Sequence, residues 1–188
     1  ARDIDEQTPQ LRRIAHAAPI VNGRPQVNIL ALSGGGSNGA FGAGILRGWT
    51  ERGTRPKFQF VTGVSAGAII APFAFLGPEY DNQLQQIWTE YQTSELIVTQ
   101  ILPGILGGPA LVDTTPLKLL IDRYIDKRFL RLVAAEHAKG RLLLIGTTNL
   151  DAGRPVFWNM GEIASSRSPG APELFRKVIL ASAAIPGA

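Results

Sequence analysis

The sequence of 188 residues predicts an α/β fold in which helices cover a mostly parallel sheet. Short apolar runs rich in β-branched residues alternate along the chain with segments of helical periodicity. Glycine-rich turns follow the first two of these runs, which is typical of strands that lead into helices. A folded chain of this length buries roughly 70% of the surface that its unfolded form exposes, so we expect one hydrophobic core.

Residues 1–26 are expected to form an N-terminal arm, and residues 27–188 to form the main domain. The arm is polar, carries a few apolar residues at helical spacing and ends in the turn-like Asn22-Gly23-Arg24-Pro25.

The first half of the domain predicts the order strand, helix, strand, helix. The second of these helices is apolar on all sides, as expected of a buried element. Each glycine inside the first helix costs about 1 kcal/mol relative to alanine, so this helix must pack closely against a neighbour. Gly53 is its expected stop. The four elements are expected at residues 27–32, 40–51, 58–62 and 66–75.

The second half predicts further helices and two strands. An amphipathic helix begins at Asp81, which is able to cap it, as is Asn82. Residues 101–112 mix aliphatic residues with glycine and proline and predict an apolar loop, either an acyl-chain wall or lid or simply a packed loop. A further helix is expected from Thr115 and continues helically over 128–139, and another is expected over 172–180. The strands are expected over 142–147 and 156–158.

Composition excludes several classes of site. The chain has no cysteine, which excludes disulfides, thiolate nucleophiles and cysteine-ligated metals. His16 and His137 are its only histidines, so we expect no metal site, and no cofactor is implied. The net charge of +4 is scattered, which argues against a nucleic-acid partner. The longest apolar stretch, residues 66–76, is well short of the roughly 18 residues of a membrane span.

A candidate catalytic motif, Gly63-Val64-Ser65-Ala66-Gly67, stands between the second predicted strand and the helix after it. A G-x-S-x-G in this context is typical of a nucleophile elbow. We expect Ser65 to adopt a strained backbone conformation, and the two glycines to let strand and helix pass close together. The alternative is a glycine-rich turn without a catalytic role.

A second glycine cluster, Ser33-Gly34-Gly35-Gly36-Ser37-Asn38-Gly39, follows the first predicted strand. Ligands of an open parallel sheet bind at the carboxyl ends of its strands, where both motifs are expected. Consecutive glycines at a helix N-terminus are able to turn backbone N–H groups toward a developing oxyanion. The cluster also satisfies the dinucleotide pattern G-x-G-x-x-G, but the acidic residue required about 20 positions later is absent.

Ser65 needs a base, and neither histidine is a good candidate. His137 lies where a helix is expected to end, and His16 lies in the N-terminal arm. A carboxylate bonded directly to the serine, in a Ser-Asp dyad, is the remaining solution. Asp151 is explained by a turn between two strands. Asp113, Asp122 and Asp126 lie on or beside a predicted helix and have no motif around them.

Together with a later Ala181-Ser182-Ala183-Ala184-Ile185-Pro186, these motifs resemble the ordered blocks of the patatin-like phospholipases, over about residues 27–188. The resemblance implies a three-layer α/β fold and a serine hydrolase without a metal or cofactor. It also implies that Ser65 is the nucleophile and that the oxyanion hole is lined by Gly34, Gly35 and Gly36.

Two features depart from the family pattern. Asn38 stands where the family often has arginine or lysine. The catalytic aspartate of the family follows the Ala-Ser-x-x-x-Pro block in a D-G-G or D-G-A motif, and no such motif follows here. Asp151 comes before the block and belongs to Asp-Ala-Gly. We therefore expect the general base beyond Ala188, in a longer protein of which this chain is a part.

The resemblance implies a phospholipase A or esterase that acts on phospholipids or other lipid esters. Peripheral contact with a membrane surface is expected from the family likeness alone. A secreted or periplasmic location is slightly favoured over a cytoplasmic one. The alternative from another class is a non-catalytic lipid- or acyl-binding domain.

Overall fold

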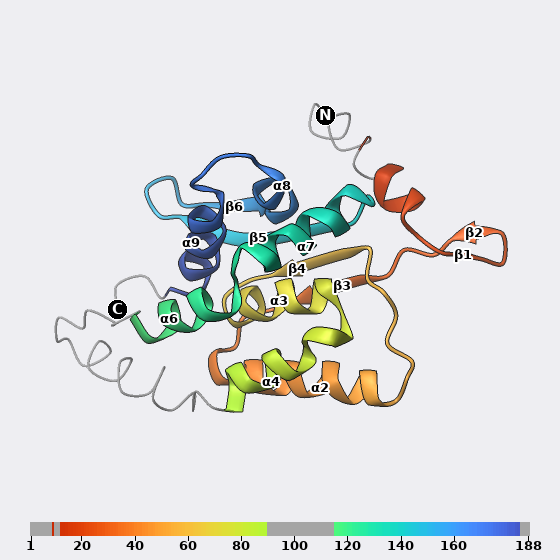
Figure 1. Cartoon of the computed structure of the whole chain (residues 1–188), viewed down its shortest axis with the longest axis horizontal. Coiled ribbons are helices and arrows are strands. Elements are labelled where there is room, and N and C mark those ends of the chain that lie inside the picture. Colours follow the sequence, from red (N-terminus) through yellow and green to blue (C-terminus); the bar gives the residue numbers. More distant parts are fainter. Residues whose placement is uncertain (1–8, 10–11, 90–114, 185–188) are drawn as a thin grey trace.

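A computed structural model of the chain describes residues 9, 12–89 and 115–184. Its centre is a four-stranded sheet with helices packed along it (Figure 1). The strands lie in the order β3 (Ile29–Leu32), β4 (Phe60–Gly63), β5 (Leu142–Asn149) and β6 (Arg154–Asn159). The first three are parallel and β6 runs antiparallel to β5. The predicted α/β class with a mostly parallel sheet is confirmed.

The register brings the ends of β3 and β4 together. Leu32, the last residue of β3, pairs with Gly63, the last residue of β4. Gly63 in turn pairs with Ile145 in the middle of β5. The two glycine-rich segments therefore follow the neighbouring carboxyl ends of β3 and β4, as the sequence predicts.

The core is built around α3 (Ala66–Leu76), in which every residue up to Phe75 is buried. This helix packs on β4 and contacts helices on both of its sides, so it has no polar face. The buried helix predicted for residues 66–75 is confirmed. None of the helices in the described ranges is long and apolar enough to cross a membrane.

The other helices surround α3. Figure 1 shows α2 and α4 lying side by side, and these two helices contact each other extensively. A short 3-10 turn, η1 (Gly36–Asn38), leads into α2, and η2 (Pro78–Tyr80) leads into α4. The helices are α2 (Gly39–Glu51), α4 (Asp81–Thr89), α6 (Thr115–Tyr124), α7 (Lys127–Ala138), α8 (Met160–Ser165) and α9 (Ala171–Ala183).

The glycines of α2 only partly meet the expectation of close packing. A Cβ on Gly39 would lie 2.1 Å from the Trp88 ring, so α4 approaches here at a distance that excludes a side chain. Gly44 and Gly48, in contrast, have nothing within 4 Å of a Cβ. The helix ends at Glu51, and Gly53, with φ of 72°, follows it as expected.

Three local features differ from the expectations. The helices α6 and α7 are separate, because Asp126 caps α7 by accepting a hydrogen bond from the Phe129 N–H at 2.7 Å. Asp81 does not cap α4, since its carboxylate accepts a hydrogen bond from Arg55 at 2.7 Å. The short helix α8 was not predicted; Asn159 caps it by accepting from the N–H of Glu162. The loop expected at residues 101–112 lies outside the described residues.

The N-terminal arm is partly packed onto the domain. Ile14 is buried, and a Cβ on Gly140 would lie 2.6 Å from the carbonyl oxygen of Arg13. The arm then forms a small antiparallel hairpin, β1 (Ile20–Val21) and β2 (Arg24–Pro25). Asn22 and Gly23 have φ of 52° and 74°, which is the conformation that a tight hairpin turn requires.

Candidate active site

Ser65 occupies the sharp turn between β4 and α3. Its backbone has φ of 55° and ψ of −122°, a region that residues other than glycine rarely adopt. Such a conformation costs about 1–3 kcal/mol and persists only where the surroundings fix it. The strained backbone predicted for this serine is confirmed.

Gly63 and Gly67 leave no room for side chains on either side of Ser65. A Cβ on Gly63 would lie 2.3 Å from the carbonyl oxygen of Gly67. A Cβ on Gly67 would lie 2.3 Å from the carbonyl oxygen of Leu32. The first turn of α3 therefore crosses the ends of β3 and β4 at a distance that only glycine permits, as the motif predicts.

The glycine-rich loop after β3 lies directly beside Ser65. A Cβ on Gly34 would lie 3.1 Å from Ser65 Cβ and 3.6 Å from Ser65 Oγ. Gly36 has φ of 53° and begins η1, which continues into α2. Within the described ranges, the backbone N–H groups of Gly34, Gly35 and Gly36 donate no hydrogen bond to another backbone group. The loop that carries these three amides therefore contacts the elbow through Gly34.

Ser182, in the last turn of α9, connects Ser65 to β5. The Ser65 N–H donates a hydrogen bond to Ser182 Oγ at 3.0 Å, and the Ser182 hydroxyl donates to the carbonyl oxygen of Gly146 at 2.6 Å. The sequence pattern assigned Ser182 no role of its own. The helical spacing does indicate that Ser182 has a hydrogen-bond partner, because it places Ser182 on the same buried face of the helix as Val178 and Ile179, where a hydroxyl needs one.

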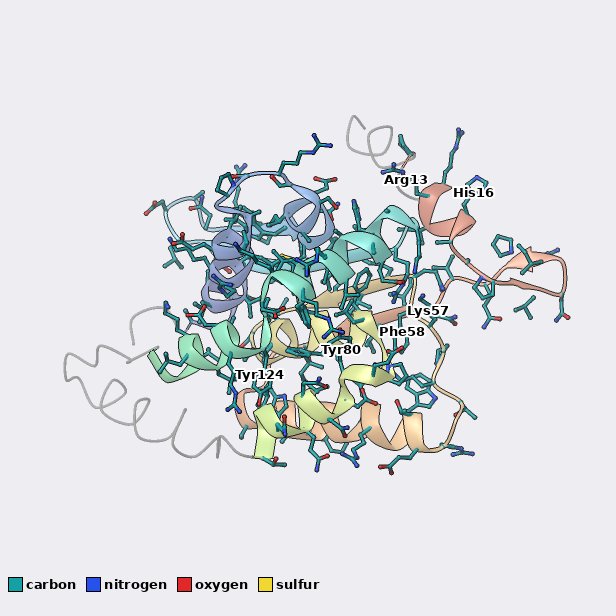
Figure 2. The ribbon with its side chains drawn as sticks, viewed as in Figure 1. Arg13, His16, Lys57, Phe58, Tyr80 and Tyr124 are labelled. Carbon is teal, nitrogen blue, oxygen red and sulfur yellow. The ribbon has the colours of Figure 1, made fainter. Side chains whose placement is uncertain are left out.

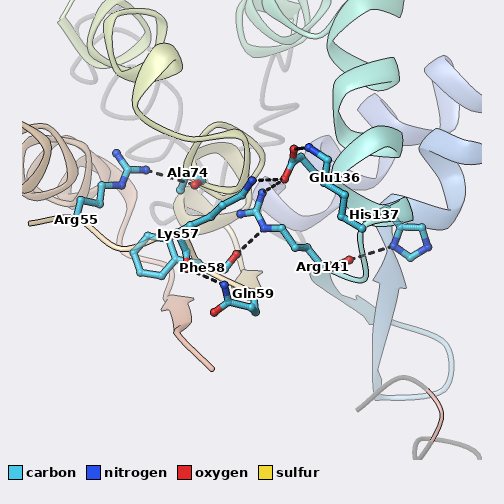
Figure 3. Close-up of polar contacts among 9 residues, drawn as sticks. Arg55, Lys57, Phe58, Gln59, Ala74, Glu136, His137 and Arg141 are labelled. Carbon is cyan, nitrogen blue, oxygen red and sulfur yellow. Dashed lines mark hydrogen bonds and ion pairs between the residues drawn. The ribbon is translucent and has the colours of Figure 1, made fainter. Parts of the chain in front are cut away.

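Neither histidine is hydrogen-bonded to Ser65. His137 lies near the end of α7, with its Nδ1 3.2 Å from the carbonyl oxygen of Arg141 (Figure 3). Its ring packs against Gly161, where a Cβ would lie 2.4 Å from the imidazole. His16 lies in the N-terminal arm, in the helical turn that precedes the β1–β2 hairpin (Figure 2).

None of the candidate aspartates in the described ranges is hydrogen-bonded to Ser65. Asp126 caps α7, and Asp122 forms ion pairs with side chains of α6 and α9 at 2.7 and 2.8 Å. Asp151 lies in the turn after β5. Since Ile145 is the partner of Gly63, the four further residues of β5 carry the chain about 13 Å past the level of Gly63. Asp113 lies outside the described residues.

Ser65 Oγ therefore has no carboxylate or imidazole partner among the residues that the structure describes. No group of three or more histidine, aspartate or glutamate residues in those ranges is arranged to hold a metal ion.

A cavity of about 290 Å³ opens beside the elbow. Val64, the neighbour of Ser65, and Ser182, its hydrogen-bond partner, both line this cavity. Three of its lining residues are large, apolar and solvent-exposed: the exposed fraction is 46% for Val64, 66% for Leu150 and 65% for Phe157. The rest of the lining comes from Gly146, Thr147, Thr148, Pro155, Ala181 and Ala184.

A charged cluster of Lys57, Glu136 and Arg141 lies near the N-terminal ends of β4 and β5 (Figure 3). The Glu136 carboxylate forms ion pairs with Arg141 at 2.7 Å and with Lys57 at 2.8 Å, just before β5 and β4 begin. The Arg141 side chain is 3% exposed and also donates to the carbonyl oxygen of Phe58. Burial alone would raise the pKa of Glu136, but hydrogen bonds from Lys139, Lys57 and Arg141 outweigh it and lower that pKa to about 2.

Comparison with protein families gives a match over residues 30–188 to the model described as patatin-like phospholipase. The matched range includes the glycine-rich loop, Ser65 and Ser182. No curated protein matches the chain.

Proposed function

Because the chain belongs to the patatin-like phospholipase family, whose members are lipid acyl hydrolases, we propose that Ser65 is the nucleophile of such an enzyme. We further propose that the amides of Gly34, Gly35 and Gly36 form its oxyanion hole. The observation that carries this proposal is the contact between the loop and the elbow: Gly34 lies directly against a serine with φ of 55°, and the loop amides have no backbone acceptor among the described residues.

The proposed reaction begins when Ser65 Oγ attacks the carbonyl carbon of an ester and its proton passes to a base. The carbonyl oxygen becomes negatively charged and accepts hydrogen bonds from the glycine-rich loop. When the tetrahedral intermediate collapses, the C–O bond breaks and the alcohol leaves with the proton, so that the acyl group stays on Ser65. Water then attacks the acyl-enzyme and gives a proton to the same base. When this second tetrahedral intermediate collapses, the bond from the acyl carbon to Ser65 Oγ breaks, the base returns the proton to Oγ, and the carboxylic acid leaves.

We propose a carboxylate as the base, in a Ser-Asp dyad. In the described ranges no carboxylate or imidazole is bonded to Ser65 Oγ, so we assign the base to residues outside them.

The cavity beside Ser65 supports a lipid ester as the substrate. Its volume of about 290 Å³ is near the lower end of the range for ligand pockets, which begins at about 300 Å³. Val64, Leu150 and Phe157 contribute exposed apolar surface to its lining, and an acyl chain is the part of a lipid ester that this surface suits. We propose that the acyl chain lies here while the ester carbonyl faces the loop.

Ester turnover by the full-length protein tests this function against a non-catalytic lipid- or acyl-binding domain. We expect Ser65→Ala to abolish hydrolysis of phospholipid and other acyl esters while acyl binding remains, because the cavity is untouched. Ser168→Ala is the control, since Ser168 lies in an exposed turn before α9. Equal turnover by Ser65→Ala and the unaltered protein would refute the proposal, and binding without turnover in the unaltered protein would favour the binding domain.

A further inference from the structure

One hydroxyl joins three segments that are far apart in the sequence. Ser182 Oγ accepts from the N–H of Ser65, 117 residues earlier, and donates to the carbonyl oxygen of Gly146, 36 residues earlier. The distances are 3.0 and 2.6 Å, and Ser182 is 8% exposed. The last turn of α9, the elbow and β5 therefore meet at this side chain.

The strained backbone of Ser65 needs such an anchor. The elbow is the N-terminus of α3, and the first N–H groups of a helix have no acceptor within the helix. Ser182 supplies an acceptor for the Ser65 N–H, and its own hydroxyl proton is directed onto Gly146. The bond that the hydroxyl donates to Gly146 of β5 fixes the orientation of the hydroxyl. The bond that the hydroxyl accepts from the Ser65 N–H then fixes the peptide plane before Ser65.

Gly146 holds the elbow in a second way. A Cβ on Gly146 would lie 3.1 Å from Val64 Cγ2, so β5 also packs against the residue that precedes Ser65. The elbow is thus supported by packing at Val64 and by the hydroxyl of Ser182.

We propose that Ser182 is a positioning residue for Ser65, which holds the Ser65 backbone so that Oγ faces the glycine-rich loop. This inference rests on the proposed function of Ser65. The Ser65 N–H is occupied by Ser182, so the donors of the proposed oxyanion hole are the loop amides of Gly34, Gly35 and Gly36 instead.

The chain offers a matched control for this serine. Ser165, at the end of α8, donates its hydroxyl to the carbonyl oxygen of Gly161 at 2.7 Å, as Ser182 does to Gly146. Ser165 accepts no hydrogen bond from the elbow among the described residues. Replacing either serine with alanine removes one helical hydroxyl and its bond to a glycine carbonyl, but only Ser182→Ala releases Ser65.

The test compares Ser182→Ala, Ser182→Thr and Ser165→Ala in the full-length protein, using a short-chain chromogenic ester and a fluorophosphonate. Rates are measured per folded molecule, with the folded fraction taken from thermal unfolding. We expect Ser182→Ala to lower kcat and the rate of fluorophosphonate labelling by about 10–100-fold with KM unchanged, since a misplacement of about 1 Å has this effect. Threonine at position 182 keeps the hydroxyl and is expected to restore most of the loss.

Other outcomes overturn the inference. If Ser182→Ala retains kcat and labelling rate per folded molecule, or loses no more than Ser165→Ala, Ser182 has only a structural role. If Ser182→Thr is as slow as Ser182→Ala although it is folded, the hydroxyl is not the group that matters. Ser65→Ala, measured alongside, separates the two proposals. If Ser65→Ala still turns over the ester, Ser65 is not the nucleophile. If Ser65→Ala is inactive but Ser182→Ala has the kcat of the unaltered protein, only the positioning role of Ser182 is refuted.

Discussion

Gly67 lies so close to Leu32 that a Cβ at position 67 would stand 2.3 Å from the Leu32 carbonyl oxygen. This contact joins the first turn of α3 to the end of β3, although the chain passes through α2 and β4 between them. Because of it, the loop that follows Leu32 and the elbow at Ser65 lie against each other. The geometry of the candidate site thus depends on residue 67 being a glycine, which has no side chain.

Gly67→Ala is expected to destabilise the protein by at least about 1–3 kcal/mol, because the new methyl group meets backbone that has no flexible end to move aside. Urea unfolding measures the change. Gly48→Ala is the control: nothing lies within 4 Å of a Cβ there, in the exposed part of α2, so it is expected to stabilise by about 0.5–1 kcal/mol. Equal effects of the two substitutions would contradict the close approach.

Gly36→Ala is expected to lower kcat by about 100-fold with a smaller change in KM, because a side chain disfavours the φ of 53° at this position and so displaces the amides that we propose as the oxyanion hole. Steady-state kinetics on a short-chain ester check this. Gly153→Ala carries a similar backbone penalty, since Gly153 has φ of 58° in the β5–β6 turn and open space around it. If both variants lose activity equally, loop strain alone explains the effect and the oxyanion role is wrong.

Phe157→Asp is expected to weaken the hydrolysis of long-chain esters about tenfold and to leave acetyl esters nearly unaffected, because a charge beside the cavity opposes burial of an acyl chain. The measurement is kcat/KM across a series of acyl lengths. Ile20→Asp places the same charge on a side chain of equal exposure in the β1–β2 hairpin and is expected to be neutral. A uniform loss across all chain lengths would argue against an acyl-chain site.

Glu136 makes stability depend on pH. Its pKa is lowered from 4.5 to about 2 in the folded chain, so its contribution is fully present above about pH 4.5 and is lost as the pH falls toward 2. Glu136→Gln is expected to reduce the free energy of unfolding at pH 7 by about 1.5–3 kcal/mol, because it leaves the buried Arg141 without its anion.

Urea unfolding between pH 7 and pH 3 measures the difference between Glu136→Gln and the unaltered protein. The difference is expected to shrink as the pH falls below about 4.5. Glu51→Gln, which breaks an exposed pair with Arg47, is expected to change stability little at any pH. A difference that stays constant across this range would show that the cluster does not act through the charge of Glu136.

Much of the fold follows from local pattern. The strands near residues 27–32 and 142–147 and the buried helix after Ser65 are strong apolar runs with clear boundaries, and the structure contains all three. The strained elbow follows from Gly63 and Gly67, because the spacing of the two glycines already encodes the close approach of strand and helix.

Other features depend on distant residues and were not predicted. The role of Asp81 is set by Arg55, 26 residues away, which outweighs a capping preference that is only local. The contact of Ser182 with Ser65 joins residues 117 positions apart. The sequence therefore placed Ser182 in a family motif but did not identify Ser65 as its partner. The helix α8 is a short helix of six residues and carries too few residues for its periodicity to be visible.

The most direct test of Ser65 as nucleophile is intact-mass spectrometry of the full-length protein after exposure to a fluorophosphonate, followed by mapping of the labelled peptide. We expect one adduct, located on Ser65, and none in Ser65→Ala. An adduct on another residue, or unchanged ester hydrolysis by a protein whose Ser65 stays unlabelled, would contradict it.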